Sequence, residues 1–93
     1  MALIFEWDPR KERTNRHKHG INFEETTTIF GDKLSITIPD ERHSTHEKRW
    51  VTIGRSNQGK LLVVVHTESS TGIRIISARK ATRAERNQYE EDS

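Results

Sequence analysis

The chain has 93 residues, of which 30% are hydrophobic and 32% are charged, so we expect a single domain over residues 1–93 with a modest core. The net charge is only +2 and there is no cysteine, which excludes disulfides, a thiol nucleophile and a thiolate metal site. No apolar run is long enough for a signal peptide or a membrane span, so we expect a cytoplasmic protein without membrane contact. A core this small is compatible with stabilisation in a dimer or in a complex with a partner protein.

The charges are unevenly distributed along the chain. Between Arg74 and Arg86 there are five basic residues and one acid, whereas Glu90 to Asp92 contribute three acids and no base. A basic surface of this kind attracts polyanions, and nucleic acid is the commonest polyanion in a cell. A solvated charged surface without a ligand is the alternative.

The first predicted elements are a short strand at residues 3–7 and a helix that follows it. Asp8 is suited to cap this helix, Pro9 to take its first position and Gly20 to end it after residue 18 or 19. The helix is basic all round and has almost no apolar face. It is therefore suited to solvent, to an acidic partner or to phosphate.

A second, short helix and two strands come next. Asn22 is its predicted cap, with Glu25 as the capping-box partner, and Gly31 ends it. Alternating apolar residues predict a strand at residues 34–38, and residues 50–55 predict another. The segment between them, residues 40–49, has no hydrophobic residue and predicts an exposed loop.

Residues 61–66 and 73–80 predict a buried hairpin around which the rest of the fold is arranged. Five consecutive aliphatic residues, which are followed by His66, suit a strand covered on both sides. Residues 68–72 have a suitable length and composition for the hairpin loop.

The loop lengths suggest a register for the sheet, in which Arg55 pairs with Leu61 and Thr67 with Ile73. This register would place Trp50, His66 and Arg74 in one cross-strand row. Arg74 and Arg79 are five residues apart, so a regular strand would put them on opposite faces. Only a bulge, or an end of the strand before Arg79, would let all these groups serve one site.

A capping box at Thr82 and Glu85 predicts a final helix that carries Tyr89. The resulting order predicts an α+β domain. Its antiparallel sheet has about four strands, with two N-terminal helices and one C-terminal helix.

Four histidines occur in close pairs, His17 with His19 and His43 with His46. The first pair is two residues apart on a helix and points in different directions, and the second lies in a polar loop without a third ligand at a recognisable spacing. We therefore expect no functional metal and no cofactor.

His66 stands out because it ends a buried strand close to several basic residues. Cleavage of RNA without a metal needs a base for the 2′-hydroxyl, donors for the negative charge of the phosphorane and a proton for the departing 5′-oxygen. One imidazole together with arginines could supply these. The alternatives are a hydrogen-bonded structural His66, a pair of Arg74 with Glu68 and a pair of Arg79 with Glu85.

Several motifs together resemble the BrnT family of toxins. They span nearly the whole chain and are Phe5-Glu6-Trp7-Asp8 with Lys11 and Asn15, Lys18-His19-Gly20-Ile21-Asn22-Phe23-Glu24-Glu25, Arg49-Trp50-Val51-Thr52-Ile53-Gly54, Val64-Val65-His66-Thr67, Arg74-Ile75-Ile76-Ser77-Ala78-Arg79-Lys80-Ala81, Glu85 and Tyr89. The resemblance implies a RelE-like fold and the toxin half of a bacterial type II toxin–antitoxin pair, with a ribonuclease activity that arrests translation. It also implies a BrnA-like antitoxin as partner, through which alone the toxin would contact DNA.

The resulting hypothesis is a metal-independent endoribonuclease with an RNA substrate. The expected catalytic residues are His66 as proton donor or base, Arg74 and Arg79 as clamps on the transition state, Lys80 as a phosphate contact and Tyr89 as a base-stacking or hydroxyl contributor. The expected RNA-binding residues are Lys11, Lys18, Arg49 and Arg55. The alternative is a non-catalytic basic module that docks a partner protein or nucleic acid.

Overall fold

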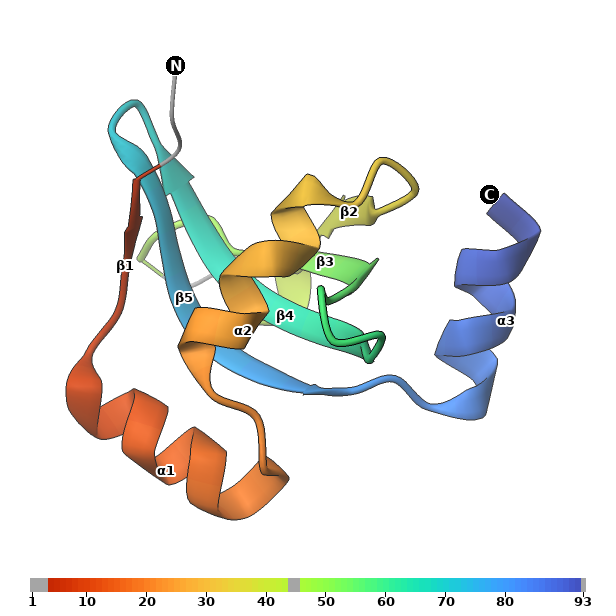
Figure 1. The fold of residues 1–93 in the computed structure, drawn as a ribbon. Helices are drawn as coiled ribbons and strands as arrows, with labels where there is room; N and C mark the ends of the chain where they lie inside the picture. The colour runs from red at the N-terminus through yellow and green to blue at the C-terminus, as the bar shows by residue number, and fades with distance from the viewer. Residues whose placement is uncertain (1–3, 44–45, 93) are drawn as a thin grey trace.

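The computed structural model describes residues 4–43 and 46–92, so Leu3 of the predicted first strand and residues 44–45 of the predicted loop lie outside the described part (Figure 1). In chain order the elements are β1 (Phe5–Glu6), α1 (Pro9–His19), α2 (Phe23–Thr27), the 3-10 helix η1 (Thr28–Gly31), β2 (Ile36–Pro39), the 3-10 helix η2 (Glu41–His43), β3 (Trp50–Arg55), β4 (Leu61–Ser69), β5 (Gly72–Lys80) and α3 (Arg83–Asp92). The α+β class and the order of helices and strands are as predicted.

The described elements form one five-stranded sheet in the order β1-β5-β4-β3-β2. Strands β2 to β5 make the predicted antiparallel meander, but β1 adds a fifth strand that runs parallel to β5. The expectation of about four antiparallel strands is corrected to a mixed sheet. The close approach of β1 requires Gly72, because a Cβ atom there would lie 2.0 Å from the carbonyl oxygen of Ile4.

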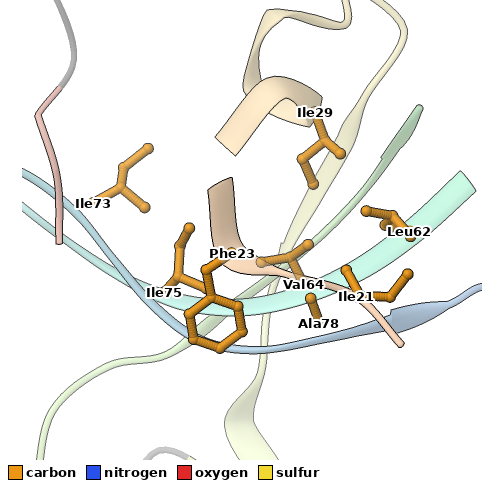
Figure 2. Close-up of a cluster of buried hydrophobic side chains, with 8 residues drawn as sticks. All are labelled: Ile21, Phe23, Ile29, Leu62, Val64, Ile73, Ile75 and Ala78. Atoms are coloured by element: carbon orange, nitrogen blue, oxygen red, sulfur yellow. The ribbon is translucent and has the colours of Figure 1, made fainter. Parts of the chain in front are cut away.

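The main hydrophobic core lies on the face of the sheet that α2 crosses (Figure 1). Figure 2 shows its buried side chains, which are Ile21, Phe23, Ile29, Leu62, Val64, Ile73, Ile75 and Ala78. A smaller cluster on the opposite face joins the sheet to α3 and consists of Ile53, Leu61, Val63 and Tyr89. Both faces of the central strands are therefore partly covered, as their aliphatic sequence predicted.

The helix caps follow the sequence prediction with one exception. Asp8 accepts a hydrogen bond from the backbone of Arg10, and Gly20 ends α1 with a φ of 72°. Asn22 accepts from the backbone N–H of Glu25 as predicted, but the carboxylate of Glu25 does not complete a capping box. It accepts instead from Ser56 at 2.7 Å and from Lys60 at 3.4 Å, and so ties α2 to the turn between β3 and β4.

Helix α1 is held to the sheet by a polar contact, since Asn15 is its one buried residue. The side chain of Asn15 accepts from the N–H of Ala78 at 3.0 Å and donates to the C=O of the same residue at 2.9 Å. It also donates to the carbonyl of Ile21 at 3.1 Å. Asn15 thus pairs with the outer edge of β5 as a neighbouring strand would, and keeps buried backbone groups hydrogen-bonded.

The predicted register is right for one loop and wrong for the other. Arg55 pairs with Leu61, but Thr67 pairs with Arg74 and not with Ile73. The strands continue to Ser69 and Gly72, so that the hairpin loop is shorter than residues 68–72. The proposed row of Trp50, His66 and Arg74 does not form, because His66 lies between Trp50 and Ile75.

Strand β5 contains a β-bulge. Val65 pairs with Ser77 while the next residue, His66, pairs with Ile75, which leaves Ile76 as an extra residue. The bulge shifts the alternation of side chains along the rest of the strand, so that Ala78 enters the main core. Arg74, Ser77 and Arg79 consequently share the opposite face.

Replacement of Asn15 by alanine should destabilise the domain. Asn15→Ala leaves three buried backbone groups without their partner, and we expect the free energy of unfolding to fall by roughly 2–4 kcal/mol. Urea denaturation measures this change, with Thr14→Ala on the exposed side of α1 as a control that stays within about 0.5 kcal/mol of the parent. An Asn15→Ala protein as stable as this control would contradict the role given to the side chain.

Candidate functional site

The face of the sheet opposite α2 carries a groove of about 310 Å³, which we call the open-face groove. It is lined by Asp40, Arg42, Val51, Val63, Val65, Ser77, Arg79 and Glu85. The valines come from β3 and β4, and the charged groups come from β5, α3 and the segment after β2. The groove therefore combines an apolar sheet surface with two arginines and two carboxylates.

Arg79 is fixed in this groove by a bidentate ion pair with Glu85. Nη1 donates to Oε1 at 2.7 Å and Nη2 donates to Oε2 at 2.8 Å, which confirms the alternative that Arg79 pairs with Glu85. Nη1 also donates to the carbonyl of Lys80 at 3.3 Å. The hydrogen bonds from Arg79 lower the pKa of Glu85 to about 2, so Glu85 is ionised at neutral pH.

The pair leaves part of the Arg79 guanidinium available to a ligand. A guanidinium has five N–H groups, and those on the edge formed by Nε and Nη2 can bind two oxygens of a phosphate at once. Nε donates to no residue in the described part of the chain, and Nη2 donates only to Glu85 there. The side chain of Arg79 is 42% exposed, and Arg79 lines the open-face groove.

Arg74 lies on the same face as Arg79 but outside the open-face groove. It is exposed and lines a separate hollow of about 240 Å³ towards the hairpin loop. Within the described residues Arg74 forms no ion pair, and the carboxylate of Glu68 lies instead 3.9 Å from Nδ1 of His66. The bulge thus aligns Arg74 and Arg79 on one face, with Ser77 between them along β5.

His66 is fully buried on the other face, against α2 and η1. Its Nε2 lies 2.7 Å from the hydroxyl of Thr52, which lies 2.7 Å from the hydroxyl of Thr37. Its ring packs edge-on against Phe30, with 5.0 Å between the ring centroids. Burial lowers the pKa of His66 to about 4, so the ring is neutral at pH 7. The structure therefore does not bring His66 together with Arg74 and Arg79.

Tyr89 and Arg55 lie together near the other end of α3. The hydroxyl of Tyr89 donates to Asp32 at 2.6 Å, and the Arg55 guanidinium lies 5.8 Å from the centre of its ring. Asp32 also accepts from the backbone of Arg55 and of Leu34. Burial and the hydrogen bond to Asp32 raise the pKa of Tyr89, which is only 4% exposed. Its hydroxyl is therefore directed at Asp32 and not at the open-face groove.

The remaining predicted residues occupy three places. Lys80 is exposed and pairs with the core residue Leu62, a register position on the face opposite Arg79. Arg49 is partly buried just before β3, and its carbonyl accepts from the backbone of Asp40. Lys11 and Lys18 line a groove between α1 and β5.

Sequence reasoning missed three polar residues of the open-face groove, which are Asp40, Arg42 and Ser77. Asp40 and Arg42 belong to a segment that predicted only an exposed loop, whereas the structure places both of them in the groove beside β3. Ser77 lies in the groove because of the bulge, and the adjacent Ile75 and Ile76 are the sequence signal of a broken alternation.

The described residues contain no group of three or more metal-ligating side chains close enough to hold an ion. Within the same part of the chain no helix is both long and apolar enough to cross a membrane.

Comparison with known proteins gives the family. A search of curated protein sequences finds no match. The fold is similar to the crystal structure of the Brucella abortus ribonuclease toxin BrnT, with a TM-score of 0.68 and 22% sequence identity over 88% of this chain and 100% of the other. Residues 7–85 match the model of the family described as "Ribonuclease toxin, BrnT, of type II toxin-antitoxin system". This chain therefore belongs to the BrnT family of ribonuclease toxins.

Proposed function

We propose that this protein is an endoribonuclease that cleaves RNA without a metal ion and thereby arrests translation. The observation that carries the proposal is the β-bulge in β5, which brings Arg79 and Ser77 to the open-face groove with Arg42 and Glu85. Family membership supports a ribonuclease toxin, and the groove supplies groups suited to a phosphodiester.

In the proposed reaction the 2′-oxygen of the RNA attacks the adjacent phosphorus while the bond from phosphorus to the 5′-oxygen breaks. Arg79 binds two phosphate oxygens through its Nε and Nη2 edge and stabilises the charge that develops on them. Arg42 provides a second positive charge at the same groove. Asp40 is the carboxylate that accepts the proton of the 2′-hydroxyl, because both oxygens of Glu85 are bound to Arg79, and a water molecule protonates the departing 5′-oxygen.

Glu85 acts on Arg79 as a positioning residue. Its two oxygens hold the guanidinium plane, so the free edge is already oriented when RNA arrives. Arg74 contacts a phosphate beside the cleaved bond, on the face that carries Arg79, and Tyr89 supports the site through α3. Lys80 lies on the opposite face and has no role in this reaction.

We assign His66 a structural role in place of proton transfer. A neutral, fully buried ring on the far side of the sheet has no route to an RNA phosphate bound at Arg79. Its hydrogen bond to Thr52 joins β4 to β3 within the core.

The partner of the toxin is an antitoxin, which we propose to be BrnA-like. Membership of a type II toxin–antitoxin family supports a protein partner. Binding of that partner neutralises the ribonuclease, and its own DNA-binding part accounts for any contact with DNA.

Removal of Arg79 should abolish most of the cleavage. We expect Arg79→Ala to lower kcat/KM for RNA by roughly 10²–10³-fold, because it removes the donors that stabilise the phosphorane. Cleavage is measured in EDTA with purified toxin, together with growth arrest on induction without antitoxin. Arg83→Ala is the matched control. It removes an exposed arginine at the first residue of α3, outside the open-face groove, and should keep near-parental activity.

Full cleavage by a folded Arg79→Ala protein would remove Arg79 from the mechanism. Loss of cleavage in EDTA by the parent protein would contradict metal independence. A parent protein that binds RNA or its partner but neither cleaves RNA nor arrests growth would support the non-catalytic binding module.

The structural role of His66 predicts a pH-dependent stability. The pKa of His66 falls from 6.5 to about 4 on folding, so between these pH values the unfolded chain binds a proton at His66 and the folded chain does not. Its stabilising contribution is complete above pH 6.5 and is lost as the pH falls towards 4. We expect the free energy of unfolding to drop by roughly 2–3 kcal/mol over this range relative to His66→Gln, which does not titrate.

Urea denaturation of both proteins across this pH range measures the difference. At neutral pH a folded His66→Gln protein should also cleave RNA within about threefold of the parent, since its side chain can still bond to Thr52. If the free energies of unfolding of the parent and of His66→Gln change equally with pH, the buried ring of His66 is not neutral as described. If the folded His66→Gln protein loses most of its cleavage activity, His66 takes part in the reaction.

A further inference from the structure

A second groove, of about 560 Å³, runs between α1 and β5. It is lined by Asp8, Arg10, Lys11, Thr14, Asn15, Lys18, His19, Ile76 and Ser77. The α1–β5 groove lies outside the proposed cleavage site, and the reaction described above does not use its basic residues.

The α1–β5 groove has an excess of positive charge. Lys11 and Lys18 are both exposed, and neither forms an ion pair with another residue of the described part of the chain. They are seven residues apart on α1, which places them about 10 Å apart along the same side of the helix. The one acid of the groove, Asp8, is engaged in capping α1 and lies 3.7 Å from Nε of Arg10.

Ser77 connects the two grooves, because it lines both of them. Strand β1 pairs with only the start of β5, at Ile73 and Arg74. No described strand therefore covers the outer edge of β5 at Ile76 and Ser77, next to the point where Asn15 binds Ala78. A ligand can pass from one face of the sheet to the other across this edge.

We propose that the α1–β5 groove is a subsite for the RNA backbone beyond the cleavage site. Single-stranded RNA lies in the open-face groove, crosses the sheet edge at Ser77 and places its further phosphates against Lys11 and Lys18. This inference rests on the proposed function and extends it to a second binding surface. RNA fits better than a docked protein segment, since such segments need apolar anchors and Ile76 is the one large apolar residue in the lining.

The double variant Lys11→Gln/Lys18→Gln tests the subsite. Binding to 2′-O-methyl oligoribonucleotides, which resist cleavage, is followed by fluorescence anisotropy with strands of about four and about twelve nucleotides. For the long strand we expect at least a tenfold loss of affinity, and a salt slope reduced by about 1.4 because two phosphate contacts are lost. Affinity for the short strand and its cleavage as unmodified RNA should stay within about twofold of the parent, since the short strand fits the open-face groove alone.

The control is Arg13→Gln/Lys33→Gln, which removes the same charge from exposed positions outside both grooves. Equal losses in the two double variants, or equal losses for short and long strands, would overturn the subsite. Loss of antitoxin binding with unchanged RNA affinity would also overturn it and would assign the groove to an acidic protein segment.

The two proposals fail in different ways. If the parent protein cleaves no RNA but shows the dependence of affinity on strand length and on Lys11 and Lys18, the proposed function fails and the subsite stands. If it cleaves RNA without that dependence, the subsite fails and the proposed function stands.

Discussion

One extra residue in β5 determines which face of the sheet carries Arg79. In a regular strand Arg79 would lie on the same face as Ile75 and would enter the main core, where an unpaired guanidinium is very costly. The bulge at Ile76 places Ala78 in the core instead and turns Arg79 towards solvent and Glu85. Packing of the core and placement of the proposed phosphate-binding group therefore depend on the same local irregularity, and neither can change alone.

Asn15 holds the backbone directly after this bulge. A bulge interrupts the ladder and leaves an edge that a neighbouring strand would normally cover, but β1 ends before it. The amide of Asn15 supplies both the donor and the acceptor that the backbone of Ala78 needs. This explains how a helix without an apolar face stays on the sheet, and it explains why α1 leaves its basic residues beside β5. The polar contact that stabilises the fold thus creates the α1–β5 groove.

The sequence predicted most helix caps and the positions of the strands well, because these depend on neighbouring residues. Asp8, Gly20 and the pair of Thr82 with Glu85 act as expected, and the pairing of Arg55 with Leu61 follows from the turn. Features that depend on distant contacts were harder to predict. Ile75 and Ile76 are both apolar, so the sequence alone does not show which of them enters the core and where the bulge lies. The partner of Asn15 lies 63 residues away. The expectation that His66 faces the arginines failed because Thr67 pairs with Arg74 and not with Ile73, and a one-residue change in register moves a side chain to the other face.

The ion pair between Arg79 and Glu85 is more important for orientation than for stability. The two side chains are 42% and 25% exposed, so water and salt screen their attraction and the pair adds little to the free energy of folding. Its geometry is nevertheless restrictive, because two parallel hydrogen bonds fix the guanidinium plane. Glu85 and Tyr89 are one helical turn apart on α3, and they bind Arg79 and Asp32 respectively. Helix α3 is thereby attached to β5 through Arg79 and to the segment after η1 through Asp32. The orientation of Arg79 consequently depends on the position of α3 relative to the sheet, and not on β5 alone.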